Sequence, residues 1–198
     1  MEKNFYLREV KTSDAKRLSE IYSYYVINTP VSFETEAVSA DEFEKRINGI
    51  KDDYPFLTAI YNNEVIGYAY AHRHHPRQAY DWNVEISVYL DKKILKHGIG
   101  SILYEALIKL LKLQNIKNIY AFIVVPNDAS MALHEKFGFT KICEYIKTGY
   151  KLGNWHNIVI MEKVIGDKSQ KPEIFIKFKN LNVKNVAVII NSFNRMYE

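Results

Sequence analysis

Two glycines in a short loop form the first pattern that is suited to chemistry. The segment Leu95-Lys96-His97-Gly98-Ile99-Gly100-Ser101 lies between an alternating apolar run and an amphipathic helical run. Because Gly98 and Gly100 have no Cβ, the backbone can turn tightly and direct successive N–H groups at one point. A helix that begins there adds its unpaired N-terminal donors and its dipole. The loop therefore predicts an anion site, although an ordinary strand-to-helix turn has the same glycine pattern.

A single acidic residue inside a predicted strand is the second candidate. Between Trp82 and Leu90, apolar and polar side chains alternate, and Glu85 lies in the middle of the polar face. A carboxylate on a central strand can act as a general base, directly or through a water. The alternative is a structural carboxylate that pairs with a lysine or with backbone donors.

Hydrophobic periodicity predicts the helices that would position these residues. Capping residues and apolar residues at helical spacing predict two helices near the N-terminus. A longer amphipathic helix follows the glycine loop, and a short one follows Pro126-Asn127-Asp128 and ends at Gly138. The expected helices cover residues Ala15–Tyr25, Ser39–Ile50, Ile99–Asn115 and Ala129–Lys136.

Runs rich in β-branched and aromatic residues predict the strands. Asn62-Asn63 tolerates a left-handed turn and predicts an antiparallel hairpin between its flanking runs. A segment rich in turn formers, Gly149–His156, is expected to separate the last two strands. The expected strands cover Phe5–Val10, Pro55–Tyr61, Glu64–Ala71, Trp82–Leu90, Ile119–Val125, Thr140–Lys147 and Asn157–Lys163.

This order of elements predicts a mixed α/β domain over residues 1–163. The unit from Trp82 to Val125 must be a right-handed parallel crossover, so the glycine loop lies at the carboxyl end of a strand, where ligands bind. From about Val164 the chain becomes a lysine-punctuated extension, residues 164–198, which could add a strand or a helix and shows no chemistry.

Composition limits the function classes. The 198 residues, 47% of them apolar, suit one domain, and the net charge of +4 comes from lysines spread along the chain. This distribution argues against a nucleic-acid-binding protein and suits a small anionic ligand. No apolar run could serve as a signal peptide or membrane span, so a cytoplasmic protein is expected. The single cysteine, Cys143, excludes an internal disulfide and is expected to be a small buried apolar residue.

Four segments in this order resemble the GNAT superfamily of acyl-CoA-dependent N-acetyltransferases. They are Val84-Glu85-Ile86-Ser87-Val88-Tyr89, Gly98-Ile99-Gly100, Pro126-Asn127-Asp128-Ala129-Ser130 and Leu133-His134-Glu135-Lys136-Phe137-Gly138-Phe139. Within the superfamily, Ala79-Tyr80-Asp81-Trp82, Leu133-His134-Glu135, Gly149-Tyr150-Lys151 and Trp155-His156 resemble the phosphinothricin N-acetyltransferase branch. The resemblance covers about residues 5 to 163. It implies a GNAT-like, largely antiparallel twisted sheet flanked by helices, with a parallel strand pair at the cofactor cleft.

The resemblance also implies a binding site for acetyl-CoA. Its pyrophosphate would bind the backbone of the glycine loop, and a backbone N–H after Glu85, from Ser87 or Val88, would polarise the thioester carbonyl. Leu95 departs from the family, which usually has Arg or Gln there, so a side-chain contact is lost and Lys96 or His97 could replace it. The expected cofactor-binding residues are Ser87, Val88, Lys96, His97, Gly98, Ile99, Gly100, Ser101, Asn127 and Ser130.

The same resemblance assigns catalysis and acceptor binding. Glu85 would be the general base and His134 the acid or a part of the proton path, with direct attack in a ternary complex. Arg77 would face an anionic group of the acceptor, while His75 stands where the family has a lysine. Phe33, Tyr80 and Tyr150 would line the acceptor pocket, although core packing is an equal alternative for these aromatic residues.

The resemblance predicts a small amino-acid-like acceptor, such as phosphinothricin, methionine sulfoximine or methionine sulfone, and a homodimer. One alternative is a protein or polyamine N-acetyltransferase, which would need an open or acidic groove. Another is a non-catalytic acyl-CoA-binding sensor. The histidines His72, His74 and His75 could be read as metal ligands, but no matching carboxylate pattern accompanies them and no metal is expected.

Overall fold

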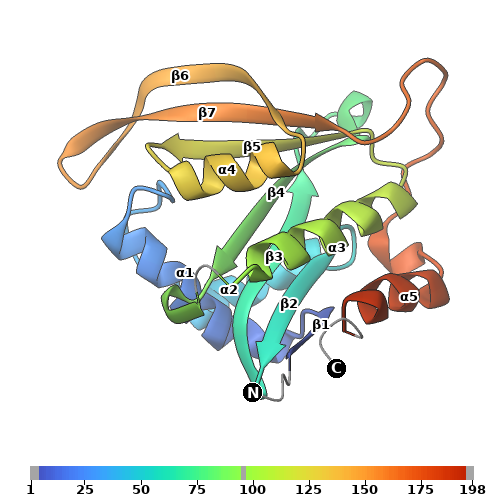
Figure 1. The fold of residues 1–198 in the computed structure, drawn as a ribbon, viewed down its shortest axis with the longest axis horizontal. Coiled ribbons are helices and arrows are strands. Elements are labelled where there is room, and N and C mark those ends of the chain that lie inside the picture. The colour runs from blue at the N-terminus through green and yellow to red at the C-terminus, as the bar shows by residue number, and fades with distance from the viewer. Residues whose placement is uncertain (1–4, 95–96, 195–198) are drawn as a thin grey trace.

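The structure is a computed structural model, which describes residues 5–94 and 97–194. Seven strands form one sheet in the order β1-β2-β3-β4-β5-β7-β6, and five α-helices flank it in the described part of the chain (Figure 1). The strands are β1 Phe5–Glu9, β2 Phe56–Tyr61, β3 Glu64–Arg73, β4 Asn83–Leu90, β5 Asn118–Val125, β6 Thr140–Lys151 and β7 Asn154–Val164. The helices are α1 Ala15–Asn28, α2 Ala40–Ile50, α3 Ile99–Leu113, α4 Asp128–Lys136 and α5 Val183–Asn194.

Neighbouring strands are antiparallel except for one pair. β4 and β5 run parallel, joined by α3 and the segment before it, whereas the other strand pairs of the sheet are antiparallel. The mixed α/β class and the parallel pair that the sequence predicted are therefore confirmed.

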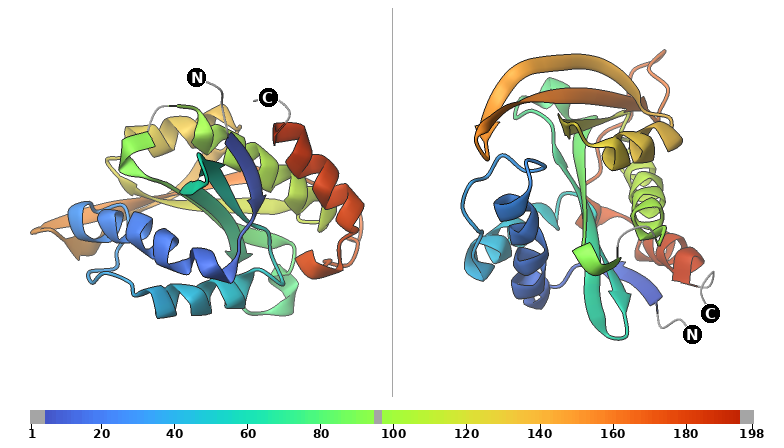
Figure 2. Two further views of the ribbon diagram at one scale, coloured as in Figure 1. Left: turned by 90° about the horizontal axis from the view of Figure 1, so that it is seen from below. Right: turned by 60° about the vertical axis from the view of Figure 1, so that its left-hand side comes forward.

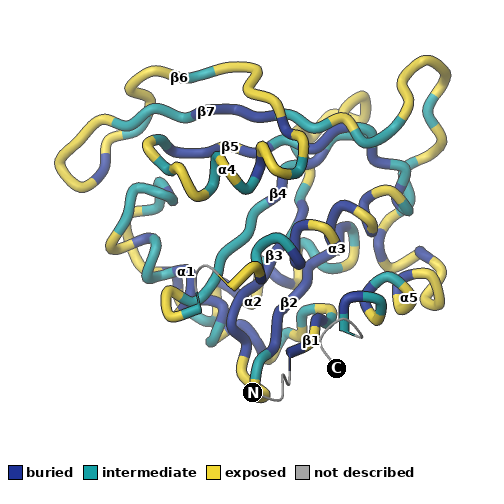
Figure 3. The backbone as a smooth tube through the Cα atoms, in the orientation of Figure 1, coloured by how far each residue is buried: buried dark blue, intermediate teal, exposed yellow. Residues whose placement is uncertain are grey.

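Helices cover both faces of the sheet and give the protein two hydrophobic cores. α1 and α2 lie on one face, and α3 and α5 lie on the other, as the second view in Figure 2 shows. The first core includes Leu18, Phe43 and Tyr68, and the second includes Leu103 and Val84 with their neighbours. Figure 3 shows the central strands as the most buried part of the chain. A rigid, doubly covered sheet thus supports β4.

The alternating pattern of β4 is confirmed. Val84 and Ile86 are buried against the α3 side of the sheet. Tyr89 lies on the other face, where its ring packs edge-on against Tyr22 at 4.9 Å between centroids. Glu85 and Ser87 share that second face, since side chains alternate along a strand.

Two expectations were wrong. The segment Gly149–His156 is mostly strand, because Gly149 pairs with His156 across the hairpin and the turn needs only Leu152 and Gly153, both at positive φ. Cys143 is exposed, because it lies on β6, the edge strand of the sheet.

The extension after residue 163 packs on the domain. In α5, Val186, Ile190 and Phe193 are buried in the same core as α3. The Asn194 side chain bonds to the edge of β1: its Oδ1 accepts from the Leu7 N–H at 2.7 Å and its Nδ2 donates to the Leu7 carbonyl at 3.1 Å. The carboxamide thus replaces a neighbouring strand at an edge that would otherwise expose unpaired groups.

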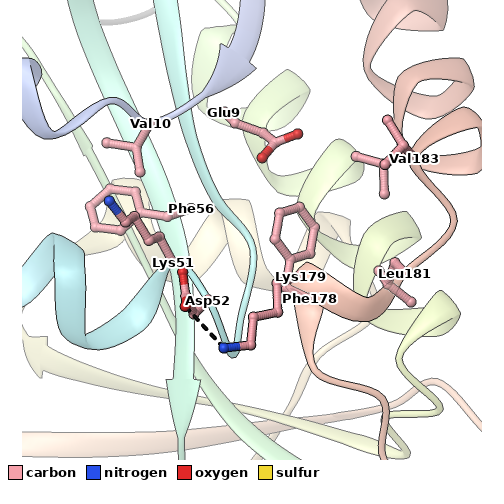
Figure 4. Close-up of a pocket in the computed structure, with 10 residues that line it drawn as sticks. Glu9, Val10, Lys51, Asp52, Phe56, Phe178, Lys179, Leu181 and Val183 are labelled. Carbon is pink, nitrogen blue, oxygen red and sulfur yellow. Dashed lines mark hydrogen bonds and ion pairs between the residues drawn. The ribbon is translucent and has the colours of Figure 1, made fainter.

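The segment between β7 and α5 is held by buried polar contacts. The Gln114 amide nitrogen donates to the carbonyls of Asp53 (2.8 Å) and Ile176 (2.7 Å). Lys179 forms an ion pair with Asp52 at 3.1 Å, beside a cavity of about 230 Å³ between the extension and the domain (Figure 4). The division into a domain of residues 1–163 and an extension of residues 164–198 stays a prediction. No helix among residues 5–94 and 97–194 is long and apolar enough to cross a membrane.

The packing of α5 predicts a contrast between two of its apolar residues. Ile190 is buried and Val188 is exposed, so Ile190→Ala should lower the free energy of unfolding by about 2–4 kcal/mol. Val188→Ala should change it by less than about 0.5 kcal/mol. Denaturant titration of both variants measures the difference. Equal losses would show that α5 does not pack through this face.

Candidate functional site

The site begins where β4 and β5 separate. The two strands pair over only three positions, Asn83 with Asn118, Val84 with Ile119 and Glu85 with Tyr120. Beyond these pairs a cleft opens between them. It is lined by Ile86–Tyr89 of β4, Ala121–Val124 of β5, Tyr104 of α3, Val31, and Asn127, Ser130 and His134 of α4. Ser87, Val88, Asn127 and Ser130, which the sequence predicted as cofactor contacts, therefore lie around one cleft.

The register of β3 and β4 decides which backbone donors face this cleft. The Asp91 N–H donates to the Ile66 carbonyl, and β4 pairs with β3 antiparallel from Val84 to Leu90. Residues alternate along such a ladder between bonding to the partner strand and pointing away from it. The Ser87 N–H therefore points toward β3, and the Val88 N–H points toward the cleft. Of the two donors expected from the sequence, only that of Val88 is directed at the cleft.

The N-terminus of α3 has the features of an anion site. Gly98 precedes the helix with φ of +78°, which favours glycine, and no side chain caps the helix. The Gly98 carbonyl already accepts the N–H groups of Ser101 and Ile102. Within the described residues, the N–H groups of Ile99 and Gly100 have no partner. This arrangement fits the predicted phosphate loop.

The space beside Gly100 is also consistent with a bound group. A Cβ built there would meet only Leu90 and Leu133 side chains, at 3.7 and 3.8 Å, which is ordinary contact. The protein's own packing therefore does not require glycine at this position. His97 is exposed. The predictions for Leu95 and Lys96 concern residues outside the described part of the chain.

A lysine from α4 brings positive charge to the same helix end. Lys136 Nζ donates to Ser101 Oγ at 3.2 Å, in the first turn of α3. Because a helix N-terminus and an ammonium group both attract anions, the two together strengthen the site. The sequence reasoning missed Lys136, although it lies two residues after His134 in the segment that carried the resemblance.

Asn127 begins α4 and orients its cleft-facing side. Its Oδ1 accepts the Ser130 N–H at 3.2 Å, which makes it the N-cap of the helix. The cap fixes the first turn of α4 at the edge of the cleft. Asn127 therefore has a structural task in addition to any contact with a ligand.

His134 is buried with both ring nitrogens engaged. Nδ1 donates to the Ser130 carbonyl at 2.7 Å, and Nε2 accepts from the Tyr104 hydroxyl. Burial lowers the pKa of His134, opposed by its bond to Ser130, and burial raises the pKa of Tyr104 well above its usual value. The pair is therefore a neutral imidazole and a neutral phenol at the wall of the cleft. No sequence pattern singled out Tyr104, apart from its place inside the predicted helix Ile99–Asn115.

Glu85 lies on the other side of β4 between two histidines. Its Oε1 accepts from His74 Nδ1 at 2.9 Å, and its Oε2 is 3.7 Å from His72 Nε2. The carboxylate is partly exposed, with 24% of its side chain accessible. Glu85 therefore reaches solvent, and within the described residues neither a lysine nor a backbone N–H, the two structural alternatives for this residue, bonds to its carboxylate.

Phe33 closes one side of this region. A Cβ on Gly149 would lie 2.1 Å from the Phe33 ring, so glycine at this position of β6 lets the ring approach the strand. Lys151, on the same face of β6, donates to the Ser32 carbonyl at 2.5 Å and ties the loop after α1 to the hairpin. Tyr150 points to the opposite face and packs on Trp155, so this chain does not bring Tyr150 to Phe33.

The loop after β3 holds the remaining predicted acceptor residues. His75 packs against His74 at 4.0 Å and against Tyr80 at 4.8 Å between ring centroids. Arg77 is exposed and, within the described residues, forms no side-chain hydrogen bond or ion pair. Its guanidinium is therefore free to meet an anion. No group of metal-ligating side chains is found among residues 5–94 and 97–194, and His74 is instead bonded to Glu85.

The burial of His134 predicts a pH dependence of stability. The folded protein keeps His134 neutral below the pKa of about 6.5 of a free imidazole, whereas the unfolded chain takes up a proton there. The free energy of unfolding should therefore fall as the pH drops below about 6.5, and His134→Gln should flatten this dependence. Denaturant titrations between pH 5 and 8 measure both slopes. Identical slopes would contradict a neutral, buried His134.

Comparison with known proteins agrees with this geometry. A family model described as an acetyltransferase (GNAT) domain matches residues 7–160. A phosphinothricin N-acetyltransferase of Streptomyces viridochromogenes is 36% identical over 152 residues, which cover 77% of this chain and 83% of the relative. An L-methionine sulfoximine/L-methionine sulfone acetyltransferase of Pseudomonas aeruginosa is 29% identical over 79% of this chain and 92% of the relative.

A solved structure has the same fold. The phosphinothricin acetyltransferase of Sinorhizobium meliloti, in complex with acetyl-CoA, superposes with a TM-score of 0.84 at 30% identity, over 91% of this chain and 98% of that one. The family match extends from β1 to β7 and includes the β4–β5 cleft, the glycine loop and α4. This chain therefore belongs to the GNAT acetyltransferase family.

Proposed function

We propose that this enzyme transfers the acetyl group of acetyl-CoA to the amine of a small amino-acid-like acceptor, by direct attack in a ternary complex. The observation that carries the proposal is the position of Glu85, a partly exposed carboxylate at the last paired position of β4 and β5. The cleft for a donor begins at this point, and a free arginine stands on the loop after β3. Relatives named for phosphinothricin and methionine sulfoximine acetylation support this acceptor class.

The donor side fits an acyl-CoA. When bound, acetyl-CoA supplies an activated acetyl thioester. The N–H groups of Ile99 and Gly100 and the Lys136 ammonium would hold its phosphates, and the Val88 N–H would donate to a carbonyl oxygen in the cleft. His97, Gly98 and Ser101 belong to the same loop, and Ser87, Asn127 and Ser130 line the cleft. Lys136 of α4 thus adds side-chain charge at the loop.

We assign the role of general base to Glu85. An α-amino group is mostly protonated near neutral pH and must lose a proton to attack a carbonyl. Glu85 Oε2 makes no hydrogen bond with His72 at 3.7 Å, so it is free to accept that proton, directly or through a water. The ammonium first loses one proton to Glu85, and the neutral amine then attacks the thioester carbonyl. As the C–N bond forms, the C–S bond to CoA breaks, and the nitrogen's second proton balances the one that the leaving thiolate takes up.

The buried pair on the other wall of the cleft would serve the leaving thiolate. Tyr104 and His134 share a hydrogen bond, and both line the cleft. His134 presents no free ring nitrogen in the described structure, so we propose that the proton comes from the Tyr104 hydroxyl, which would turn from His134 Nε2 toward the thiolate. The pair would supply a proton on the side of β4 opposite to Glu85.

Acceptor binding is assigned to the surface around Glu85. Arg77 would meet the carboxylate or phosphinate of the acceptor, since guanidinium pairs with such groups through two parallel hydrogen bonds. Phe33, His75 and Tyr80 would line the pocket; Tyr150 would reach it only from another chain.

We also propose a homodimer, supported by exposed apolar side chains on β6 and β7 such as Ile146, Tyr150 and Trp155. A solution mass of 23.2 kDa, that of one chain, would contradict the dimer.

An activity assay tests the proposed function. Purified protein with acetyl-CoA should release free thiol in the presence of phosphinothricin, methionine sulfoximine or methionine sulfone, and not with a polyamine. Glu85→Gln should lower kcat by about 100-fold or more, the usual contribution of a general base, while leaving acetyl-CoA binding unchanged. Calorimetry measures that binding separately. Binding of acetyl-CoA without turnover of any amine would contradict the proposal and favour a sensor.

Substitution of two cationic side chains should change the KM of one substrate each, Arg77 that of the acceptor and Lys136 that of acetyl-CoA. Arg77→Ala should raise the KM of the acceptor about 10-fold or more with little change for acetyl-CoA, because its guanidinium would meet only the acceptor. Lys136→Ala should do the reverse and make acetyl-CoA binding less sensitive to salt. Initial rates with each substrate varied in turn measure both effects. Equal effects of either variant on both KM values would contradict the assignment.

A further inference from the structure

We propose that His74 is a positioning residue for the general base, holding the Glu85 carboxylate in the orientation in which it accepts a proton. This inference rests on the proposed function of Glu85. His74 directly follows β3. Its backbone N–H donates to the carbonyl of Asn83, the first residue of β4, at 3.4 Å. Its side chain reaches across to the same face of the sheet as Glu85.

The contact between the two side chains has a defined direction. His74 Nδ1 lies 2.9 Å from Glu85 Oε1. Because an ionised carboxylate only accepts hydrogen bonds, Nδ1 carries the hydrogen and donates it. A hydrogen bond to a charged group is stronger than one between neutral groups. One carboxylate oxygen is therefore fixed, and Oε2 is left for the acceptor.

The imidazole itself is held by aromatic packing. It stacks on Tyr120 with ring centroids 4.5 Å apart and planes inclined by 23°. Tyr120 is anchored in turn: its hydroxyl donates to Glu162 Oε1 at 3.0 Å and accepts from Asn118 Nδ2 at 3.2 Å. His74 is only 14% exposed in its side chain, compared with 37% for His72. The ring is thus fixed from β5 and β7.

The charged and titratable groups around this pair come from several elements. His72 on β3 lies 3.7 Å from Glu85, and His75 and Tyr80 of the following loop pack on His74. Tyr120 on β5 donates a hydrogen bond to Glu162 of β7. Tyr70 of β3 lies near enough to Glu85 to feel its charge. A glutamate side chain has three rotatable bonds, and among these neighbours in the described structure His74 is the one that donates a hydrogen bond to the Glu85 carboxylate.

Two substitutions separate hydrogen bonding from stacking. His74→Phe keeps a ring for Tyr120 and removes the donor, while His74→Asn keeps an N–H donor near the position of Nδ1 and removes the ring. The proposal expects His74→Phe to lower kcat with the acceptor by about 10- to 100-fold and to alter the pH profile, with acetyl-CoA affinity unchanged. His74→Asn should recover most of the rate. His72→Phe, which removes the more distant ring, should cost less than His74→Phe.

The Glu85→Gln background shows whether the two residues act together. In that background, His74→Phe should cause little further loss, because the group that His74 positions is gone. Wild-type rates in His74→Phe, equal losses in His74→Phe and His74→Asn, or additive losses with Glu85→Gln would each overturn the proposal.

A ligand-free measurement separates this inference from the proposed function. In ¹⁵N-detected imidazole spectra, His74 should show the Nδ1–H tautomer, and Glu85→Ala should abolish its slowly exchanging proton. If wild-type protein acetylates no amine, the proposed function fails; the spectrum still decides whether His74 holds Glu85. A His74 signal unaffected by Glu85→Ala would overturn the positioning role.

Discussion

The separation of β4 from β5 is the constraint on which the rest of the structure depends. Parallel strands normally satisfy their backbone groups along their whole length, yet here the ladder ends after Glu85 and Tyr120. Each strand tolerates this because its other edge is paired: β4 with β3, and β5 with β7 along its full length. The divergence leaves backbone donors such as the Val88 N–H facing a cleft, which is where a carbonyl group can replace the missing strand.

The same divergence sets the place of the chemical groups. Because side chains alternate along β4, the last paired residue, Glu85, lies on the α1 side of the sheet, while Tyr104 and His134 line the α3 side of the cleft. The proposed base and the proposed proton donor therefore lie on opposite sides of β4, so that one does not protonate the other directly. α3 is the crossover helix between β4 and β5, and Lys136 of α4 adds its charge to the first turn of that helix. The cleft and the proposed base therefore both lie at one break in the sheet.

Local patterns predicted much of this from the sequence. The alternation of β4, the capped start of α4 at Asn127 and the positive φ of Gly98 each depend on nearby residues, so periodicity and turn chemistry were sufficient. Contacts that depend on strand register were not predictable in this way. The bond from His74 to Glu85 requires the β3–β4 register, and the exposure of Cys143 requires knowing that β6 is an edge strand. The turn-forming residues of Gly149–His156 led to a wrong prediction, because the hairpin turn needs only Leu152 and Gly153. The packing of α5 depends on tertiary contacts that its own sequence does not specify.

The amide of Val88 gives the most direct test that the break between β4 and β5 receives the acetyl group. In backbone NMR spectra, acetyl-CoA should move the Val88 amide proton downfield relative to its position with CoA alone, because only the acetylated form carries the thioester carbonyl oxygen that this N–H is proposed to bind. The Ser87 amide, committed to β3, should move less. A Val88 amide at the same position with both ligands would contradict the account.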